Sequence, residues 1–134
     1  MNPSHEAGRR DIRDEDLHGI LESFYATLGR DTLLASYFEE IDMSAHIPRI
    51  VTFWSTILFG THTYSGNAFA PHQRMPGLTG HHFGRWVETI EATIDARFSG
   101  PKAEEMKTVS HRIAYSMQLR LGIVLFGAYP SASG

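Results

Sequence analysis

Apolar residues recur every three or four positions over most of the chain, and this spacing constrains the fold more than any other feature of the sequence. Such a period aligns apolar side chains along one face of an α-helix. A half-buried strand would instead need alternation of apolar and polar residues, which is absent over any length. We therefore predict an all-α fold, with apolar helical stripes over residues 17–28, 33–38, 47–58, 83–98 and 106–124.

Small polar residues and glycines predict where these helices begin and end. Asp31 and Ser44 are suited to cap the second and third helices, because their side chains can accept from the free N–H groups of a first turn. Pro48 then falls in or just beyond that first turn, where proline is best tolerated. The predicted stops are Gly29, Gly60, the Gly100-Pro101 pair and a position near Gly127.

The length of 134 residues corresponds to one domain. We expect a single domain over 1–134, with 1–13 as a flexible N-terminal extension and 128–134 as a flexible tail. The polar N-terminus carries no signal-like apolar stretch, and no run approaches the roughly 18 apolar residues of a membrane helix. The formal net charge of −3 disfavours nucleic acid as a partner. We expect a cytoplasmic protein without a membrane partner.

The central third of the sequence, residues 43–87, contains no aspartate or glutamate. The same stretch holds three arginines and five of the eight histidines of the chain. This composition suits an anionic ligand, although chance in a short protein explains it equally well. The residues are Arg49, Arg74, Arg85, His46, His62, His72, His81 and His82.

Common catalytic and metal-binding motifs are missing. There is no H-E-x-x-H, no calcium-binding loop, no phosphate-binding glycine loop and no G-x-S-x-G. The sequence has no cysteine, and zinc would need several histidines from scattered elements. A cofactor held by one histidine remains possible, because His72 precedes a helix that carries Phe83 and Trp86. A flat apolar cofactor needs such walls, an axial imidazole and cations. A solvated loop histidine is the alternative.

An ordered set of residues resembles the group III truncated haemoglobins. It comprises F-Y at 24–25, F at 38, H at 46, F-W at 53–54, G-x-x-x-Y-x-G at 60–66, H at 72 and H-F-x-x-W at 82–86. The resemblance extends from about Leu17 to about Gln118. It implies the fold of this bacterial family, a small helical sandwich that encloses one haem b.

The resemblance also implies roles for individual residues. His72 matches the iron ligand on the proximal side, and Tyr25, His46 and Trp86 match residues on the distal side, where small ligands bind. Phe38 matches the phenylalanine that packs on the haem, and Arg49 would reach toward a propionate. The other residues expected at the haem are Ile50, Phe53, Met75 and Phe83.

These roles compete with simpler interpretations. From pattern alone, Tyr25 and Trp86 are core residues, and Phe53 and Trp54 are packing or haem-wall residues without a chemical role. We expect four other histidines to lie on the surface: His62, His81, His82 and His111.

The family implied by the resemblance suggests binding of O2 and other small ligands. Donation from Tyr25 and Trp86 to a bound ligand would slow its release, which favours chemistry on NO or peroxide over oxygen transport. Such a reaction would need an unidentified reductase. The alternatives are a haem-based sensor without turnover and a helical interaction domain without a cofactor. Because His46 follows the predicted Ser44 cap closely, we also expect its imidazole to swing between pocket and solvent as a gate.

Overall fold

The computed structural model describes residues 9–61, 75 and 77–123, and this part of the chain is helical, as predicted. An isolated bridge between Arg10 and Phe98 is its only extended pairing. The helices are η1 (Asp14–Asp16), α2 (Leu17–Leu28), η2 (Ala35–Phe38), α3 (Met43–Phe59), α5 (Gly80–Asp95) and α6 (Pro101–Leu121), where η marks a 3-10 helix.

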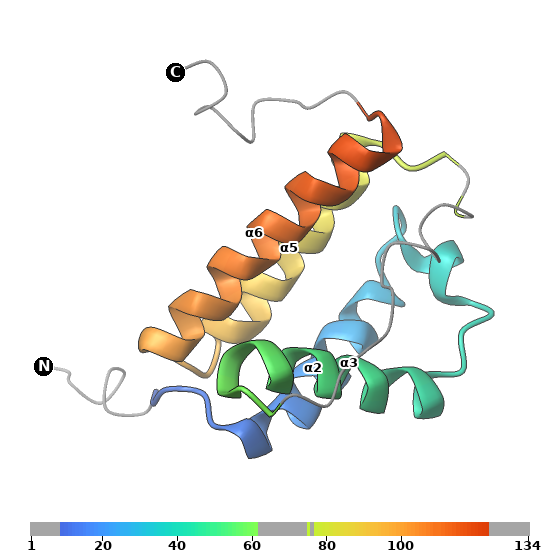
Figure 1. Ribbon diagram of the computed structural model, residues 1–134. Helices are drawn as coiled ribbons and strands as arrows, with labels where there is room; N and C mark the ends of the chain where they lie inside the picture. Colours follow the sequence, from blue (N-terminus) through green and yellow to red (C-terminus); the bar gives the residue numbers. More distant parts are fainter. Residues whose placement is uncertain (1–8, 62–74, 76, 124–134) are drawn as a thin grey trace, which may run out of the picture.

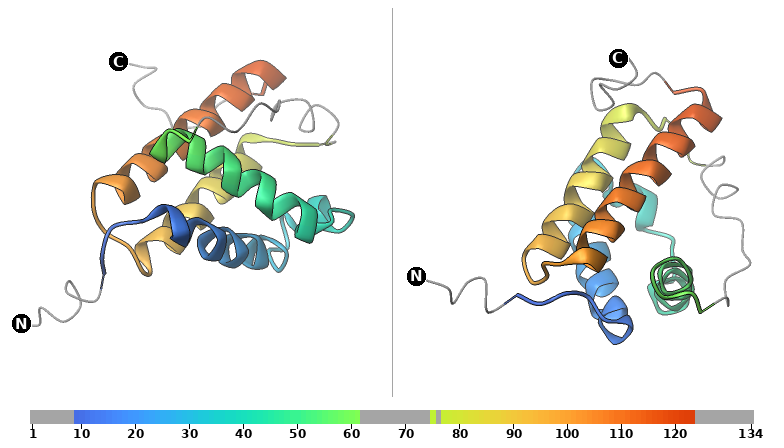
Figure 2. Two further views of the ribbon diagram at one scale, coloured as in Figure 1. Left: turned by 60° about the horizontal axis from the view of Figure 1, so that its bottom comes forward. Right: turned by 60° about the vertical axis from the view of Figure 1, so that its left-hand side comes forward.

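The four α-helices of the described residues form two pairs. α5 and α6 lie antiparallel and pack along their length, while α2 packs against α3 (Figure 1). The pairs are joined because α2 also contacts α5 and α3 also contacts α6. The two turned views show the α5–α6 pair crossing the other two helices (Figure 2). The result is a helical sandwich of two layers.

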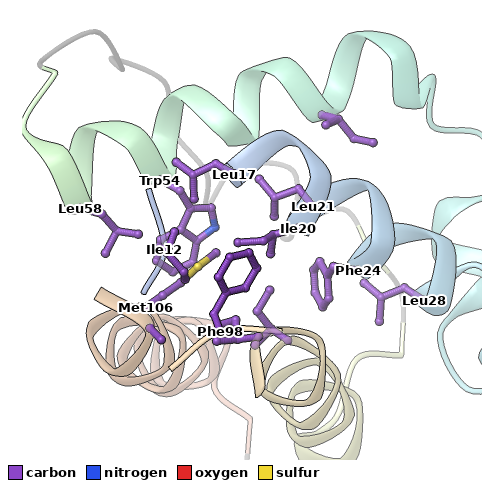
Figure 3. Close-up of a cluster of buried hydrophobic side chains, with 14 of the residues drawn as sticks. Ile12, Leu17, Ile20, Leu21, Phe24, Leu28, Trp54, Leu58, Phe98 and Met106 are labelled. Atoms are coloured by element: carbon purple, nitrogen blue, oxygen red, sulfur yellow. The ribbon is translucent and has the colours of Figure 1, made fainter. Parts of the chain in front are cut away.

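The main core lies where these helices meet (Figure 3). Leu17, Leu21 and Phe24 of α2 are almost completely buried, which follows from their helical spacing. Trp54 of α3 is only 3% exposed, so its interpretation as a packing residue is confirmed. Other members of this core are Ile12, Ile20, Leu28, Leu58, Ile90, Ile94, Phe98 and Met106.

The expectation that 1–13 is a flexible extension is wrong for residues 9–13. Ile12 is 3% exposed within the core, and the carbonyl of Arg10 accepts from Ser99 N–H at 3.0 Å. The carboxylate of Asp11 accepts from the backbone N–H groups of Lys102 and Ala103, both at 2.9 Å. These are free donors of the first turn of α6, which begins after Gly100 and so has no side-chain cap of its own. The N-terminal segment supplies that cap.

Three predicted helix ends are also wrong. α5 ends at Asp95 and not at the Gly100-Pro101 pair. Asp42, not Ser44, caps α3: its side chain accepts from Ser44 N–H at 3.1 Å, so α3 begins at Met43. α6 ends at Leu121 and not near Gly127, because Gly122 adopts φ 71° and terminates it. The predicted end of α3 at Gly60, with φ 68°, is confirmed.

The predicted short helix over residues 33–38 is only partly formed. Asp31 accepts from Leu33 N–H at 2.8 Å through its side chain and from Leu34 and Ala35 through its carbonyl. These bonds make turns, and only Ala35–Phe38 is helical, in the tighter 3-10 form. Asp31 therefore stabilises a turn and does not cap a regular helix.

Candidate functional site

Tyr25 and His46 are joined directly, from α2 and α3 respectively. The Tyr25 hydroxyl lies 3.1 Å from His46 Nε2, and the two rings meet edge to face with centroids 5.0 Å apart. Both side chains are partly buried. Tyrosine is protonated at neutral pH, and burial raises the pKa of the Tyr25 hydroxyl further, so the phenol has a proton to donate. The structure thus brings together two of the three distal residues implied by the resemblance.

The position of His46 follows from the cap of α3. Its backbone N–H donates to the carbonyl of Asp42 at 2.9 Å, which makes His46 the fourth residue of the helix. The imidazole is therefore directed from a formed helical turn onto Tyr25. Pro48 follows two positions later and lacks a backbone donor, so the carbonyl of Ser44 receives no bond from it.

Aromatic rings connect the Tyr25–His46 pair to the rest of the site. Tyr25 meets Phe38 with ring centroids 5.8 Å apart and Phe24 with centroids 5.0 Å apart. Phe24 in turn meets Trp86 of α5 at 5.9 Å. Within the described residues, Trp86 thus adjoins the pair through Phe24, and no hydrogen bond links its indole to Tyr25 or His46.

The face of α3 that carries His46 is apolar and only partly buried. Ile50 and Phe53 lie four and seven positions after His46, which places them on the same side of the helix. The adjoining side of α3 is buried in the core through Trp54 and Leu58. A haem pocket needs apolar side chains that cover the macrocycle and polar groups that can donate to a ligand. The half-exposed apolar stripe of α3 suits the first need, and the neighbouring hydroxyl and imidazole suit the second.

The other residues expected at a haem are more dispersed. Arg49 is exposed on α3, and Met75 is partly buried. Phe83 is 7% exposed in a second cluster between α5 and α6, where it packs with Val87, Ala114 and Met117. His72, with His62 and Arg74, lies outside the described residues. In the described ranges, no group of three or more His, Asp or Glu side chains is arranged to hold a metal ion.

Two histidines assigned to the surface have structural partners. His82 is partly buried, and its Nδ1 accepts from Thr79 N–H at 3.0 Å, which caps α5. Its ring also meets Tyr37 at 5.5 Å. His111 Nε2 lies 2.7 Å from Glu91 across the α5–α6 interface. His81 is exposed, as predicted.

An ion pair beside the site was missed from sequence. Arg85 of α5 donates to Asp31, just after α2, with 2.7 Å between Nη1 and Oδ2. Arg85 directly precedes Trp86 in the chain. The two charges are 54 positions apart, so no local pattern could have indicated that they meet. The arginine holds the pKa of the Asp31 carboxyl below its usual range.

Among the described helices, none combines the length and apolar character needed to cross a bilayer.

Comparisons with known proteins agree with this architecture. Over 70 residues the chain is 31% identical to the group 1 truncated hemoglobin GlbN of Mycolicibacterium paratuberculosis, and the alignment spans about half of each chain, 52%. The crystal structure of a group III truncated hemoglobin from Campylobacter jejuni matches with a TM-score of 0.74 at 22% identity, covering 82% of this chain and 91% of the other. The truncated globin fold is thereby confirmed. A model of bacterial-like globins matches residues 13–119, and the chain belongs to the bacterial-like globin family.

Proposed function

We propose that this chain holds one haem b and binds O2 and other small ligands on the side formed by Tyr25 and His46. The observation that carries the proposal is their 3.1 Å hydrogen bond, set beside the half-buried apolar face of α3. Membership of a globin family supports haem-linked ligand binding as the general class. When bound, haem supplies an iron atom at which diatomic ligands attach.

His72 is the iron ligand in this proposal, on the strength of its match to the family pattern. Phe38, Ile50 and Phe53 would cover the macrocycle with apolar side chains. Arg49, exposed on α3, is available to a propionate at the solvent edge.

The chain's own donors define what the site does to a ligand. Tyr25 is protonated at neutral pH, as burial only raises its pKa further, and a neutral hydroxyl can donate to negative charge on a ligand. Trp86 would supply a second donor through its indole N–H. Each such bond is worth about 1–3 kcal/mol, so two together slow ligand release by at least about 30-fold.

Slow release is poorly suited to oxygen delivery. We infer that the site serves reactions of NO or peroxide, with electrons from a separate reductase. The polar pair in apolar surroundings supports this choice, because charge developing on a ligand is stabilised most strongly where water is excluded.

The absorption spectrum of the purified protein, reconstituted with haem, is the first test. An intense Soret band is expected, and its absence would refute the proposal. The second test supplies a reductant and measures consumption of NO in the presence of O2, and separately of peroxide. Turnover with either substrate is expected. A haem protein that turns over neither substrate would be a sensor or binding module.

A further inference from the structure

We infer that the Asp31–Arg85 ion pair is a positioning device that holds Trp86 at the correct distance and orientation from Tyr25. The inference rests on the proposed ligand-binding function of that site. Its basis is a closed ring of contacts around the site, in which the ion pair is the polar link between α5 and the end of α2.

Asp31 fixes the α2 side of this ring. Its Oδ1 accepts from Leu33 N–H at 2.8 Å, and its backbone N–H donates to the carbonyl of Leu28 at 3.1 Å. The carboxylate side chain is 11% exposed. Asp31 therefore belongs rigidly to the end of α2 and to the turn that leads toward Phe38, whose ring packs on Tyr25.

Arg85 fixes the α5 side. Its Nη1 lies 2.7 Å from Asp31 Oδ2, and the next residue on the same helix is Trp86. Because a helix is locally rigid, holding Arg85 restricts how α5 can slide or rotate relative to α2. Trp86 meets Phe24, and Phe24 meets Tyr25, so the aromatic contacts close the ring on the other side.

A second carboxylate offers a matched control. Glu88 Oε1 lies 3.8 Å from Nε of the same Arg85, but both residues belong to α5 and the Glu88 side chain is 76% exposed. Removing its charge changes the surroundings of Arg85 without loosening α5 from α2. A general effect of surface charge would appear in both carboxylate variants, whereas a positioning effect would appear only in the Asp31 variant.

The experiment compares Asp31→Asn, Arg85→Gln and Glu88→Gln in the full-length protein reconstituted with haem. The readouts are the O2 dissociation rate, the infrared stretching band of bound CO, and the melting temperature. The CO band responds to nearby hydrogen-bond donors and not to stability as such. We expect Asp31→Asn and Arg85→Gln each to shift or broaden that band and to raise the O2 dissociation rate about two- to fivefold. Glu88→Gln should leave both unchanged.

The double variant Asp31→Asn/Arg85→Gln should release O2 no faster than either single variant, because all three variants lack the same ion pair. Arg85→Gln keeps the Asp31–Leu33 bond, so it also tests the pair if Asp31→Asn fails to fold. An unchanged CO band in Arg85→Gln, or an equal shift in Glu88→Gln, would overturn the inference while the Soret band still supported the proposed function. A wild-type protein without a Soret band would instead refute the proposed function itself.

Discussion

The Tyr25 hydroxyl and His46 Nε2, 3.1 Å apart, share a single hydrogen bond whose direction depends on the histidine tautomer. If the phenol donates to an unprotonated Nε2, its only proton is engaged and a ligand must compete for it. If Nε2 carries the proton and donates, the phenol proton is free for a ligand. The imidazole therefore controls whether Tyr25 can act as a donor.

Replacement of Tyr25 by phenylalanine tests its role as a donor. The substitution removes the hydroxyl but keeps the ring contacts with Phe38 and Phe24. In the haem-loaded protein, we expect the O2 dissociation rate, measured by stopped flow, to rise about tenfold or more, because a hydrogen bond to a partly charged ligand is lost.

Replacement of Trp86 by phenylalanine tests the second donor. We expect faster O2 dissociation here too, and a double-mutant cycle with Tyr25→Phe should show coupling because both groups would donate to one ligand. If both single variants stay within about twofold of the wild-type rate, a hydrogen bond of the usual strength is excluded at each position. Both residues would then be core residues, as the sequence pattern alone suggests.

The gate proposed for His46 predicts an effect on ligand entry. In the structure, the imidazole must give up its bond to Tyr25 in order to turn outward, and the loss of that bond contributes a net cost of about 1 kcal/mol. We therefore expect His46→Ala to change the O2 association rate more than the dissociation rate, with five-coordinate ferrous iron before ligand is added. A six-coordinate ferrous spectrum that this variant converts to five-coordinate would show that His46 binds iron.

The layers of this fold could be predicted from sequence, but several helix ends could not. Helical periodicity is a local property, and the buried stripe of α2 follows it closely. The cap of α6 comes instead from Asp11, 91 positions before Lys102, and such a contact has no local signature. The start of α3 was misplaced for a different reason. Asp42 and Ser44 are both good caps, and the sequence alone does not choose between them.

The candidate site could likewise be predicted only in part from the sequence. Periodicity places Tyr25 on an amphipathic helix, but only the family resemblance distinguished it from a core tyrosine. Its contact with His46 depends on how α2 and α3 pack, which no spacing within either helix specifies. The Asp31–Arg85 pair could not be predicted, because Asp31 is also suited to cap a local helix, and that interpretation accounts for it without a distant partner.

Replacement of His72 by alanine tests the proposed iron ligand. We expect stable haem incorporation to be lost, or to depend on added imidazole, because the proximal bond then has no protein donor. Haem titration followed at the Soret band measures this directly. His81→Ala, at an exposed position on α5, is the matched control and should bind haem normally. A His72→Ala protein with unchanged affinity and ferrous spectrum would contradict the assignment.

The cap that Asp11 provides for α6 makes stability depend on pH. Burial tends to raise the pKa of this carboxyl, but its hydrogen bonds from Lys102, Ala103 and Ile12 outweigh burial and lower it. A carboxyl whose folded pKa is depressed stabilises the fold above its unfolded value of about 3.9, and this contribution is lost as pH falls through the folded pKa.

Asp11→Asn should therefore destabilise the protein at neutral pH and lose its effect in acid. Asparagine keeps one acceptor oxygen but leaves one N–H of the first turn of α6 unsatisfied, which costs about 1 kcal/mol. Urea unfolding at neutral pH should show this difference, and it should shrink as pH falls below about 3.9, where the wild-type carboxyl is also losing its charge. Glu40→Gln, at an exposed position, should match the wild type throughout. A constant difference across the pH range would mean that the shape of Asp11, and not its charge, stabilises α6.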